Sequence, residues 1–465
     1  MPERDHAVVV GSGMGGLLAA RVLSESFGEV TVVERDAVPL DAKPRRGVPQ
    51  GRHVHGFQAR GVEIIGELFP GVLDEARAEG VSVIDDLSRC HFAPGGHLLA
   101  QESWPIAPIL LASRPFLEHA VRRRVAAHPR IRVLENTEVT GLIRDAPGDR
   151  SPASVLGVRI SAARDGSSER PLPAELVVDA SGRGCRVPRW LPQLGYRRPE
   201  EERLTVRVRY ASEQVQLPPA SYPRELVIEG RTPTRPLGMA LFACEHDTWT
   251  FTVMGTDQAP PPTTHEGMVE AVSELAPEWV VEALRGARPR GRVSSHHFPA
   301  SVRHRYDRLT AFPRGLLVFG DAMCSYNPIY GTGMSVAAEQ ALALRRTLAD
   351  GPDHDLALRF FREAARPVGQ AWQLAVGSDM AMPEVEGDRP LAMRLSSRYV
   401  DRVLSAAEQD PEVARRFLRV AGLVDPPSAL LGPRVVARVV RAALLPSRQR
   451  GSAASSVVQR RVSAA

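Results

Sequence analysis

Two glycine-rich stretches, about 300 residues apart, have the residue types that bind phosphates and sugars. The first is GSGMGG at residues 11–16, and the second is FGDAMCSYNPIYGTGMS at residues 319–335. In the first, Gly11 suits a tight turn, Gly13 lets a pyrophosphate approach the backbone, and Gly16 allows a helix to pack closely on a strand. These residues predict a dinucleotide site and leave NAD and FAD both open.

The residues around the first stretch form a βαβ pattern. Ala-Val-Val-Val at residues 7–10 is typical of a buried parallel strand, and LLAARVLSESF has apolar residues at helical spacing. EVTVVER then supplies a second strand that ends near Glu34. The helix would direct free N–H groups at the phosphates, and Glu34 can accept hydrogen bonds from an adenosine ribose with an unphosphorylated 2′-hydroxyl.

The second stretch favours FAD over NAD. An apolar strand over residues 315–320 ends at Asp321, and a helical pattern runs from Gly333 to about Leu348. Asp321 can accept hydrogen bonds from ribityl hydroxyls, while Gly331 and Gly333 remove side chains where a flavin ring would approach. The helix N-terminus would face the pyrimidine edge of that ring. FAD is long enough to need binding groups at both of its ends, whereas NAD would not need this second clamp.

Three segments resemble one superfamily. GLLVFGDAMCSYNPIYGTGMSVAAEQALAL resembles the flavin-binding segment of the para-hydroxybenzoate-hydroxylase-fold flavoprotein monooxygenases. AELVVDASGRGCRVPRWL resembles their middle motif, with Asp179 at a strand end. RRGVPQGRHVHGFQARGVEIIGELFPG, residues 45–71, is similar to the squalene-epoxidase-like branch, which includes epoxidases of polyether antibiotic biosynthesis. The resemblance covers roughly residues 5–350.

The resemblance implies an α/β (α+β) fold with a Rossmann-like FAD-binding domain, an inserted, mostly antiparallel β-sheet substrate domain and a C-terminal helical region. Alternating runs such as LTVRVRY and ELVIEG agree with the inserted sheet. We expect an FAD-binding domain at 1–75, 107–194 and 300–350, a substrate domain at 76–106 and 195–299, a helical region at 351–447 and a disordered tail at 448–465.

The resemblance also assigns residues to the cofactor. Arg114 begins a helix that Ser113 can cap and Pro115 suits, although a surface arginine at a helix start is the alternative. The residues expected to bind FAD are Gly11, Gly13, Met14, Gly15, Gly16, Glu34, Arg35, Arg46, Arg52, Arg114, Val139, Asp179, Asp321, Pro328, Gly331, Gly333 and Met334. We expect four residues to line an apolar substrate pocket: Met239, Phe242, Trp249 and Phe251. For each of them, a place in the hydrophobic core is the alternative.

The implied activity is insertion of one O2-derived oxygen, through a flavin C4a-hydroperoxide, into an alkene of a polyketide or terpenoid in secondary metabolism. NAD(P)H would reduce the flavin transiently or through a separate reductase, and the partners would be a lipophilic small molecule, O2 and a flavin reductase or carrier. Because the flavin carries the chemistry, no side chain is assigned as an acid or base.

Four alternatives follow from the same residues. Aromatic hydroxylation uses the same flavin chemistry, a reductase or dehydrogenase would use FAD without O2, and a degenerate flavoprotein would only bind or carry. Halogenation is disfavoured because a W-x-W-x-I-P motif is missing and the single lysine, Lys43, lies in a Pro/Arg loop.

Composition excludes several other classes. A net charge of +5 and 5% aromatic residues do not predict a nucleic-acid surface. Four cysteines far apart predict neither a zinc ribbon nor a disulfide framework, and His53 and His55 lack further residues to complete a metal site. Without a signal-like segment or a long apolar run, we expect a cytoplasmic protein.

A C-terminal segment, GPRVVARVVRAALLPSR, predicts an amphipathic helix. Its arginines are Arg434, Arg438 and Arg441, and its apolar face is Val435, Val436, Val439, Val440, Ala443 and Leu444. The pattern favours a helix docked on the body of the protein over contact with a membrane or a carrier.

Overall fold

A five-stranded parallel sheet brings the three sequence motifs to one edge. The computed structural model describes residues 4–45, 47–145, 153–162, 169–218, 223–350 and 353–444. The strand order is β18-β11-β1-β2-β7, with every neighbour parallel. The strands are β1 (Arg4–Val10), β2 (Phe27–Val33), β7 (Ile131–Leu134), β11 (Leu176–Asp179) and β18 (Leu316–Val318). Val10 lies opposite Asp179, and Asp179 lies opposite Val318, so the loops that follow these three strands leave the sheet side by side.

Helices pack around this sheet because their sequences carry apolar faces. α1 (Met14–Ser26) packs against α8 (Gly333–Ala349) and α4 (Arg114–Ala126), and α8 packs against α9 (Leu356–Asp379). Phe319, directly after β18, stacks on Phe360 of α9, and both rings are fully buried. The predicted βαβ unit and the predicted helix after Gly333 are therefore confirmed.

A large, mostly antiparallel sheet forms the second region, as predicted. Its order is β19-β17-β12-β15-β14-β13-β5, with β16 beside β12, and only the β13–β5 pair is parallel. The strands are β5 (Cys90–Ala93), β12 (Glu201–Gln216), β13 (Leu226–Glu229), β14 (Gly238–Ala243), β15 (Trp249–Thr256), β16 (Arg288–Pro289), β17 (Ser294–His304) and β19 (Cys324–Ser325).

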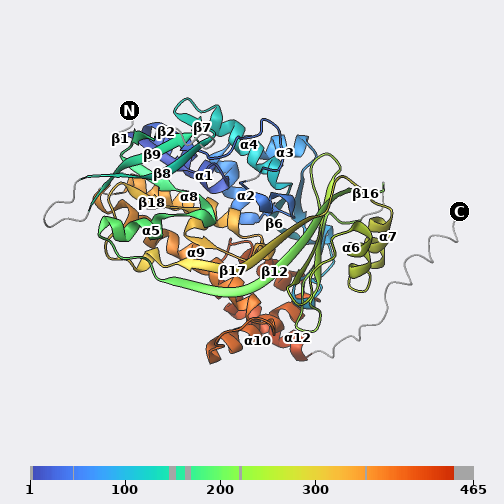
Figure 1. Ribbon diagram of the computed structural model, residues 1–465. Helices are drawn as coiled ribbons and strands as arrows, with labels where there is room; N and C mark the ends of the chain where they lie inside the picture. The colour runs from blue at the N-terminus through green and yellow to red at the C-terminus, as the bar shows by residue number, and fades with distance from the viewer. Residues whose placement is uncertain are drawn as a thin grey trace, which may run out of the picture.

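β12 and β17 are long strands that run from the side of α5 (Val187–Trp190) to the region of β16 (Figure 1). Their register shifts between Thr205 and Val208, where Arg207 has φ 46°. A bulge of this kind bends a strand while its pairing continues on both sides.

Two small sheets complete the strands. One has the order β10-β9-β8 and the other β3-β6-β4. Their strands are β8 (Thr137–Arg144), β9 (Val155–Ala162), β10 (Arg170–Pro173), β3 (Gly56–Phe57), β4 (Ser82–Asp86) and β6 (Pro105–Leu111).

The two faces of the large sheet belong to different cores. Because side chains alternate along a strand, Leu241 and Val253 share one face, which α6 (His265–Val272) and α7 (Glu278–Arg285) cover. Tyr210, Phe242 and Phe298 lie on the other face, in an apolar cluster with residues of β6 and the C-terminal helices.

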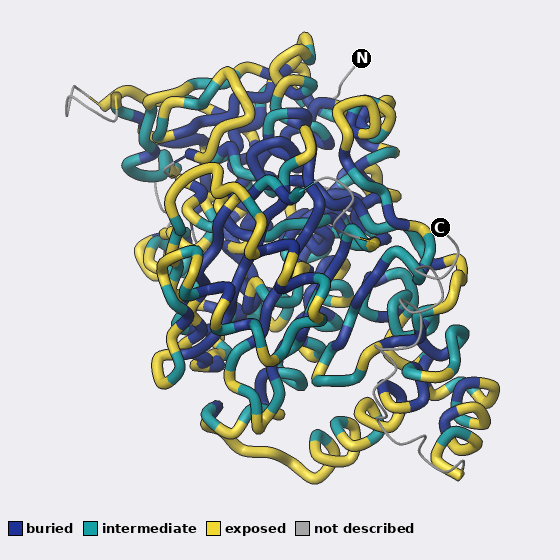
Figure 2. The backbone as a smooth tube through the Cα atoms, turned by 90° about the vertical axis from the view of Figure 1, so that its right-hand side faces the viewer, coloured by how far each residue is buried: buried dark blue, intermediate teal, exposed yellow. Residues whose placement is uncertain are grey.

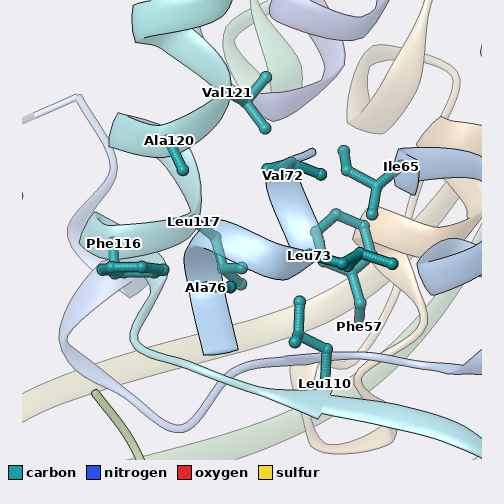
Figure 3. Close-up of a pocket in the computed structure, with 10 residues that line it drawn as sticks. All are labelled: Phe57, Ile65, Val72, Leu73, Ala76, Leu110, Phe116, Leu117, Ala120 and Val121. Carbon is teal, nitrogen blue, oxygen red and sulfur yellow. The ribbon is translucent and has the colours of Figure 1, made fainter. Parts of the chain in front are cut away.

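A small apolar cavity lies between β3, β6, α2 (Ala59–Leu68), α3 (Val72–Ala78) and α4, where the side chains point toward one another (Figure 3). The lining residues are Phe57, Ile65, Val72, Leu73, Ala76, Leu110, Phe116, Leu117, Ala120 and Val121. Since all of them are apolar, this cavity is a packing gap and offers nothing to a phosphate or a sugar.

Three C-terminal helices lie at one end of the molecule, and much of their backbone is exposed (Figure 2). They are α10 (Leu391–Ala407), α11 (Pro411–Ala421) and α12 (Pro433–Leu444). Val435 and Val439 are buried, so α12 docks on the body as predicted. In the described ranges, no helix has both the length and the hydropathy needed to cross a bilayer. The expected tail, 448–465, lies outside the described residues, and the domain boundaries stay a prediction.

Candidate active site

The two glycine-rich loops and the middle motif meet in space. A Cβ added to Gly15 would lie 3.8 Å from the Cα of Gly320, and one added to Gly333 would lie 3.8 Å from Asp321 Oδ1. A Cβ on Gly182, in the middle motif, would lie 3.9 Å from the Cβ of Asp321. Segments separated by about 300 residues therefore lie side by side, which is the convergence that a single extended ligand requires, and the surface that they share is called the recess.

The first loop has a conformation that only glycine fits. Gly11 has φ +96°, and a Cβ on Gly16 would lie 1.9 Å from the carbonyl oxygen of Gly11. At Gly13, by contrast, an added Cβ would meet only Arg45 Nη2, at 3.8 Å, so the backbone there is open. Gly13 caps α1 without a side-chain hydrogen bond. The first-turn amides of α1 are thus available to a phosphate.

Glu34 is a buried, ionised carboxylate beside this loop. Its Oε2 accepts hydrogen bonds from Ser12 N at 2.9 Å, Ser12 Oγ at 2.7 Å and Arg45 Nη1 at 3.0 Å. Burial opposes ionisation, but the Arg45 charge and the hydrogen bonds outweigh it and lower the pKa of Glu34. Arg45 Nε also donates to Glu118 Oε2 at 3.1 Å. Sequence reasoning did not assign Glu118, because nothing in its helical context marks it as a partner of Arg45.

Arg45 and residues 47–56 extend from this carboxylate to the large sheet. A Cβ on Gly51 would lie 3.5 Å from Arg114 Cγ, and Val54 N donates to Thr252 Oγ1 at 3.4 Å. His53 Nδ1 lies 2.7 Å from Ser212 Oγ, and burial lowers the pKa of His53 to about 3, so the ring is neutral. No group of three or more His, Cys, Asp or Glu suited to a metal is found in the described ranges.

Asp321 lies beside Gly182 of the middle motif. Its side chain is exposed to solvent, yet the surrounding protein raises its pKa against the opposing charges of Arg114 and Arg183. Arg114 itself is buried, and its Nε donates to Glu118 Oε1 at 2.8 Å, so the surface alternative for Arg114 is wrong. Ser113 caps α4 by accepting from Phe116 N at 3.3 Å, as predicted.

The second loop presents unsatisfied polar groups. Gly331 has φ +63°, and Thr332 caps α8 without a side-chain hydrogen bond. The Thr332 hydroxyl is buried and lacks a hydrogen-bond partner among the described residues. A free hydroxyl beside the amides of a helix N-terminus fits a ring edge rich in oxygen and nitrogen, such as the pyrimidine edge of FAD. The residues present therefore fit the cofactor.

A buried polar chain connects this loop to the sheet. Tyr210 donates to Asn327 Oδ1 at 2.6 Å, and Asn327 Nδ2 donates to Asp379 Oδ1 at 2.8 Å. Tyr330 donates to the same Asp379 oxygen at 2.7 Å. Burial raises the pKa of Asp379 to about 6 despite these hydrogen bonds. Sequence reasoning missed Asp379, since a lone aspartate at the end of a helical pattern carries no signal.

The predicted substrate pocket needs a correction. Met239, Trp249 and Phe251 point to the face that α6 and α7 cover, so these three are plain core. Phe242 alone among the four lies on the opposite face of the sheet, where its ring lies 3.9 Å from a Cβ built on Gly56. Strand alternation sets this outcome: Met239 and Phe242 are three residues apart on β14 and therefore point in opposite directions.

The remaining predicted cofactor residues lie as follows. Met14, Val139 and Met334 are buried, Arg35, Arg52 and Pro328 are exposed, and Arg46 lies outside the described residues. Asp179 ends β11 as predicted, and its carboxylate accepts from Ser181 N at 3.0 Å. Their roles toward FAD stay predictions. Lys43 is exposed and pairs with Asp41 at 2.7 Å.

Comparisons with known proteins agree with this geometry. The model of the FAD binding domain family matches residues 5–354. Protein Rv3254 of Mycobacterium tuberculosis is 36% identical over 465 residues, covering 96% of each chain. Kynurenine 3-monooxygenase of Salinispora tropica is 26% identical over 427 residues, 87% of this chain and 85% of the relative.

Two further matches are more distant. Squalene monooxygenase of Mus musculus is 24% identical over 356 residues, 75% of this chain and 55% of the relative. Among solved structures, p-nitrophenol 4-monooxygenase PnpA of Pseudomonas putida superposes with a TM-score of 0.64 at 17% identity, over 92% of this chain and all of that one, which shows a common fold. The chain therefore belongs to the FAD binding domain family, among the flavoprotein monooxygenases, and is an enzyme whose cofactor is FAD.

Proposed function

We propose that this enzyme adds one O2-derived oxygen to an alkene of a lipophilic polyketide or terpenoid. The observation that carries the proposal is the sheet face opposite α6 and α7, where Ala240, Phe242 and Phe298 belong to one apolar cluster. Such a wall suits an uncharged, apolar substrate. The match to squalene monooxygenase, named for a lipophilic substrate, supports the same class.

Within this proposal the chain binds FAD at both ends. The α1 amides and Glu34 would hold the pyrophosphate and the adenosine ribose, while Asp321 would accept hydrogen bonds from the ribityl chain. The N-terminus of α8, with Thr332, would hold the ring edge. When bound, FAD supplies the activation of O2, with electrons from NAD(P)H delivered directly or through a separate reductase.

The side chains of the recess then orient the substrate and exclude water. Phe242 and Phe298 contribute apolar contact, and the C-terminal helices cover the same cluster. Keeping water out of such a site limits unproductive release of reduced oxygen.

The test is turnover of purified holoenzyme with NAD(P)H, with and without an added flavin reductase, on a polyene and on a phenol of similar size. We expect a product one oxygen atom heavier than the polyene, with the oxygen bridging a former double bond. If oxygen is found only in the phenol ring, the enzyme is an aromatic hydroxylase and not an epoxidase. Full product yield without O2 would show a flavin reductase or dehydrogenase instead.

Aromatic hydroxylation is the second candidate because polar groups lie on the same face. His53, Ser212 and Thr252 form a hydrogen-bonded series, with Ser212 Oγ 2.6 Å from Thr252 Oγ1. A neutral imidazole beside a hydroxyl can orient a phenolic oxygen. The match to kynurenine 3-monooxygenase supports this alternative.

A further inference from the structure

Exposed apolar side chains gather on the C-terminal helices. Of the ten large apolar residues that are exposed in the described ranges, six lie between the start of α10 and the end of α12. They are Leu391, Leu395, Val400, Leu431, Val440 and Leu444. These six, with the arginines of α10 and α12, are called the C-terminal surface, and both helices lie at the lower end of the molecule in Figure 1.

α12 has two apolar stripes rather than one. Val435 and Val439 point into the protein, whereas Val440 is 53% exposed and Leu444 80% exposed. Val440 and Leu444 are four residues apart and therefore lie on one side of the helix. Docking on the body accounts for the first stripe and leaves the second without a partner among the described residues.

Arginines accompany the exposed stripe. α12 contains Arg434, Arg438 and Arg441 and no acidic residue. Of these, Arg438 pairs with Asp410 at 2.7 Å. α10 contains three arginines and one acid, Asp401, whose carboxylate is 3.1 Å from His97 Nε2. Glu386 and Asp388 precede α10, so the excess of positive charge is greatest on α12.

We propose that the C-terminal surface docks on an anionic lipid bilayer, with α12 and the start of α10 lying in the interface. Apolar side chains beside arginines on an exposed helix are the features of interfacial helices, and anionic headgroups attract arginine. A second copy meeting the same face would bring arginine against arginine, which disfavours self-association there.

The proposal places the recess close to a source of lipophilic substrate. Val403, Leu404, Val435 and Val439 belong to the same apolar cluster as Phe242, so the docked helices cover the substrate side of the sheet. Delivery of substrate from the bilayer rests on the proposed function. The docking itself does not.

Flotation of the full-length holoenzyme with lipid vesicles tests the docking. One vesicle type contains phosphatidylcholine with phosphatidylglycerol, and the other contains phosphatidylcholine alone. We expect binding to the anionic vesicles that weakens as salt is added, and little binding to the neutral ones. The variant Leu391→Ser/Leu395→Ser/Val440→Ser/Leu444→Ser should bind more than tenfold more weakly. Arg434→Gln/Arg441→Gln should lose roughly 25-fold, about fivefold for each arginine.

Matched variants change exposed residues elsewhere. Leu40→Ser/Leu156→Ser and Arg292→Gln/Arg314→Gln should float like the wild type. All variants should keep their FAD content, because none changes the recess. Equal binding to both vesicle types, no binding to either, or loss of binding in the matched variants would overturn the docking. If the wild type is a dimer and the four-serine variant is a monomer, the C-terminal surface is an interface between two copies of the chain, and the membrane docking is overturned. A floating protein that lacks epoxidation would overturn only the proposed function.

Discussion

Single backbone atoms decide the geometry of the first loop. At Gly16 the gap to the Gly11 carbonyl is too small for any side chain, because an added Cβ would lie 1.9 Å from that oxygen. The close approach lets α1 begin directly at the end of β1, with its amides at the recess. This position tests the fold and the cofactor site together.

Gly16→Ala should lower the free energy of unfolding by about 1–3 kcal/mol or more, since the backbone of Gly11 must move. It should also reduce the flavin-to-protein ratio measured by visible absorbance. Gly184→Ala is the control, because no heavy atom lies within 4 Å of a Cβ there. Equal behaviour of the two variants would contradict the close packing.

Asp321→Ala should weaken FAD binding roughly 10- to 100-fold, the effect of losing a hydrogen bond to a charged group. Titration of the apoprotein with FAD measures the loss. Asp74→Ala, at an exposed aspartate on α3, should leave affinity unchanged. An unchanged affinity in Asp321→Ala would remove this carboxylate from the cofactor site.

Asp379 should make stability depend on pH. Burial raises its pKa to about 6 in the folded protein, above the ordinary value of 3.8. Between these values the folded state holds a proton that the unfolded state has released, so this contribution to stability falls as pH rises from about 4 to above 6.

Relative to Asp379→Asn, the wild type should therefore lose about 1–2 kcal/mol of unfolding free energy between pH 5 and pH 7.5. Urea unfolding at the two pH values measures the difference. A constant difference would mean that Asp379 ionises normally in its chain with Asn327 and Tyr330.

At the scale of elements, the two faces of the large sheet should have different roles. Side chains on the face under α6 and α7 should contribute to stability, and side chains on the other face should contact the substrate. Phe251→Ala should cost about 3–5 kcal/mol of unfolding free energy, because its ring is fully buried against α6 and α7. Its KM should stay near that of the wild type. Phe242→Ala should raise KM or change the product ratio, since its ring lies on the sheet face that we propose contacts the substrate. Steady-state kinetics on the two variants compares them, and a reversed pattern would contradict the assignment of faces.

Local sequence predicted the elements around the proposed cofactor site, because their signals are local. Glycine spacing and an apolar run sufficed to predict β1 and α1, and the apolar pattern after Gly333 sufficed to predict α8. The roles of Glu34 and Asp321 toward FAD stay predictions. The direction of Trp249 and the burial of Arg114 depend on which elements cover them, and composition does not contain that information. Asp379 acquires its environment only when α9 meets the Asn327 loop.

At the scale of the molecule, one ligand should stabilise distant segments together. Because we propose that FAD contacts the loops that follow β1 and β18, its binding should raise the stability of the whole parallel-sheet region by about 2.7 kcal/mol at 100 times the Kd. Thermal unfolding of the apoprotein with FAD or NAD measures this effect. Equal stabilisation by NAD would contradict a site built for the longer cofactor.

The paired strands β12 and β17 connect the parallel-sheet side to the far end through one ladder, with Glu201 opposite His304 and Ser212 opposite Ser294. Swinging one half away from the other would break many of these backbone hydrogen bonds at once. We therefore expect any opening of the enzyme to occur by local shifts of helices and side chains beside these strands, and not by a hinge movement of one half against the other. Entry and exit of the reactants should then be set by the C-terminal helices.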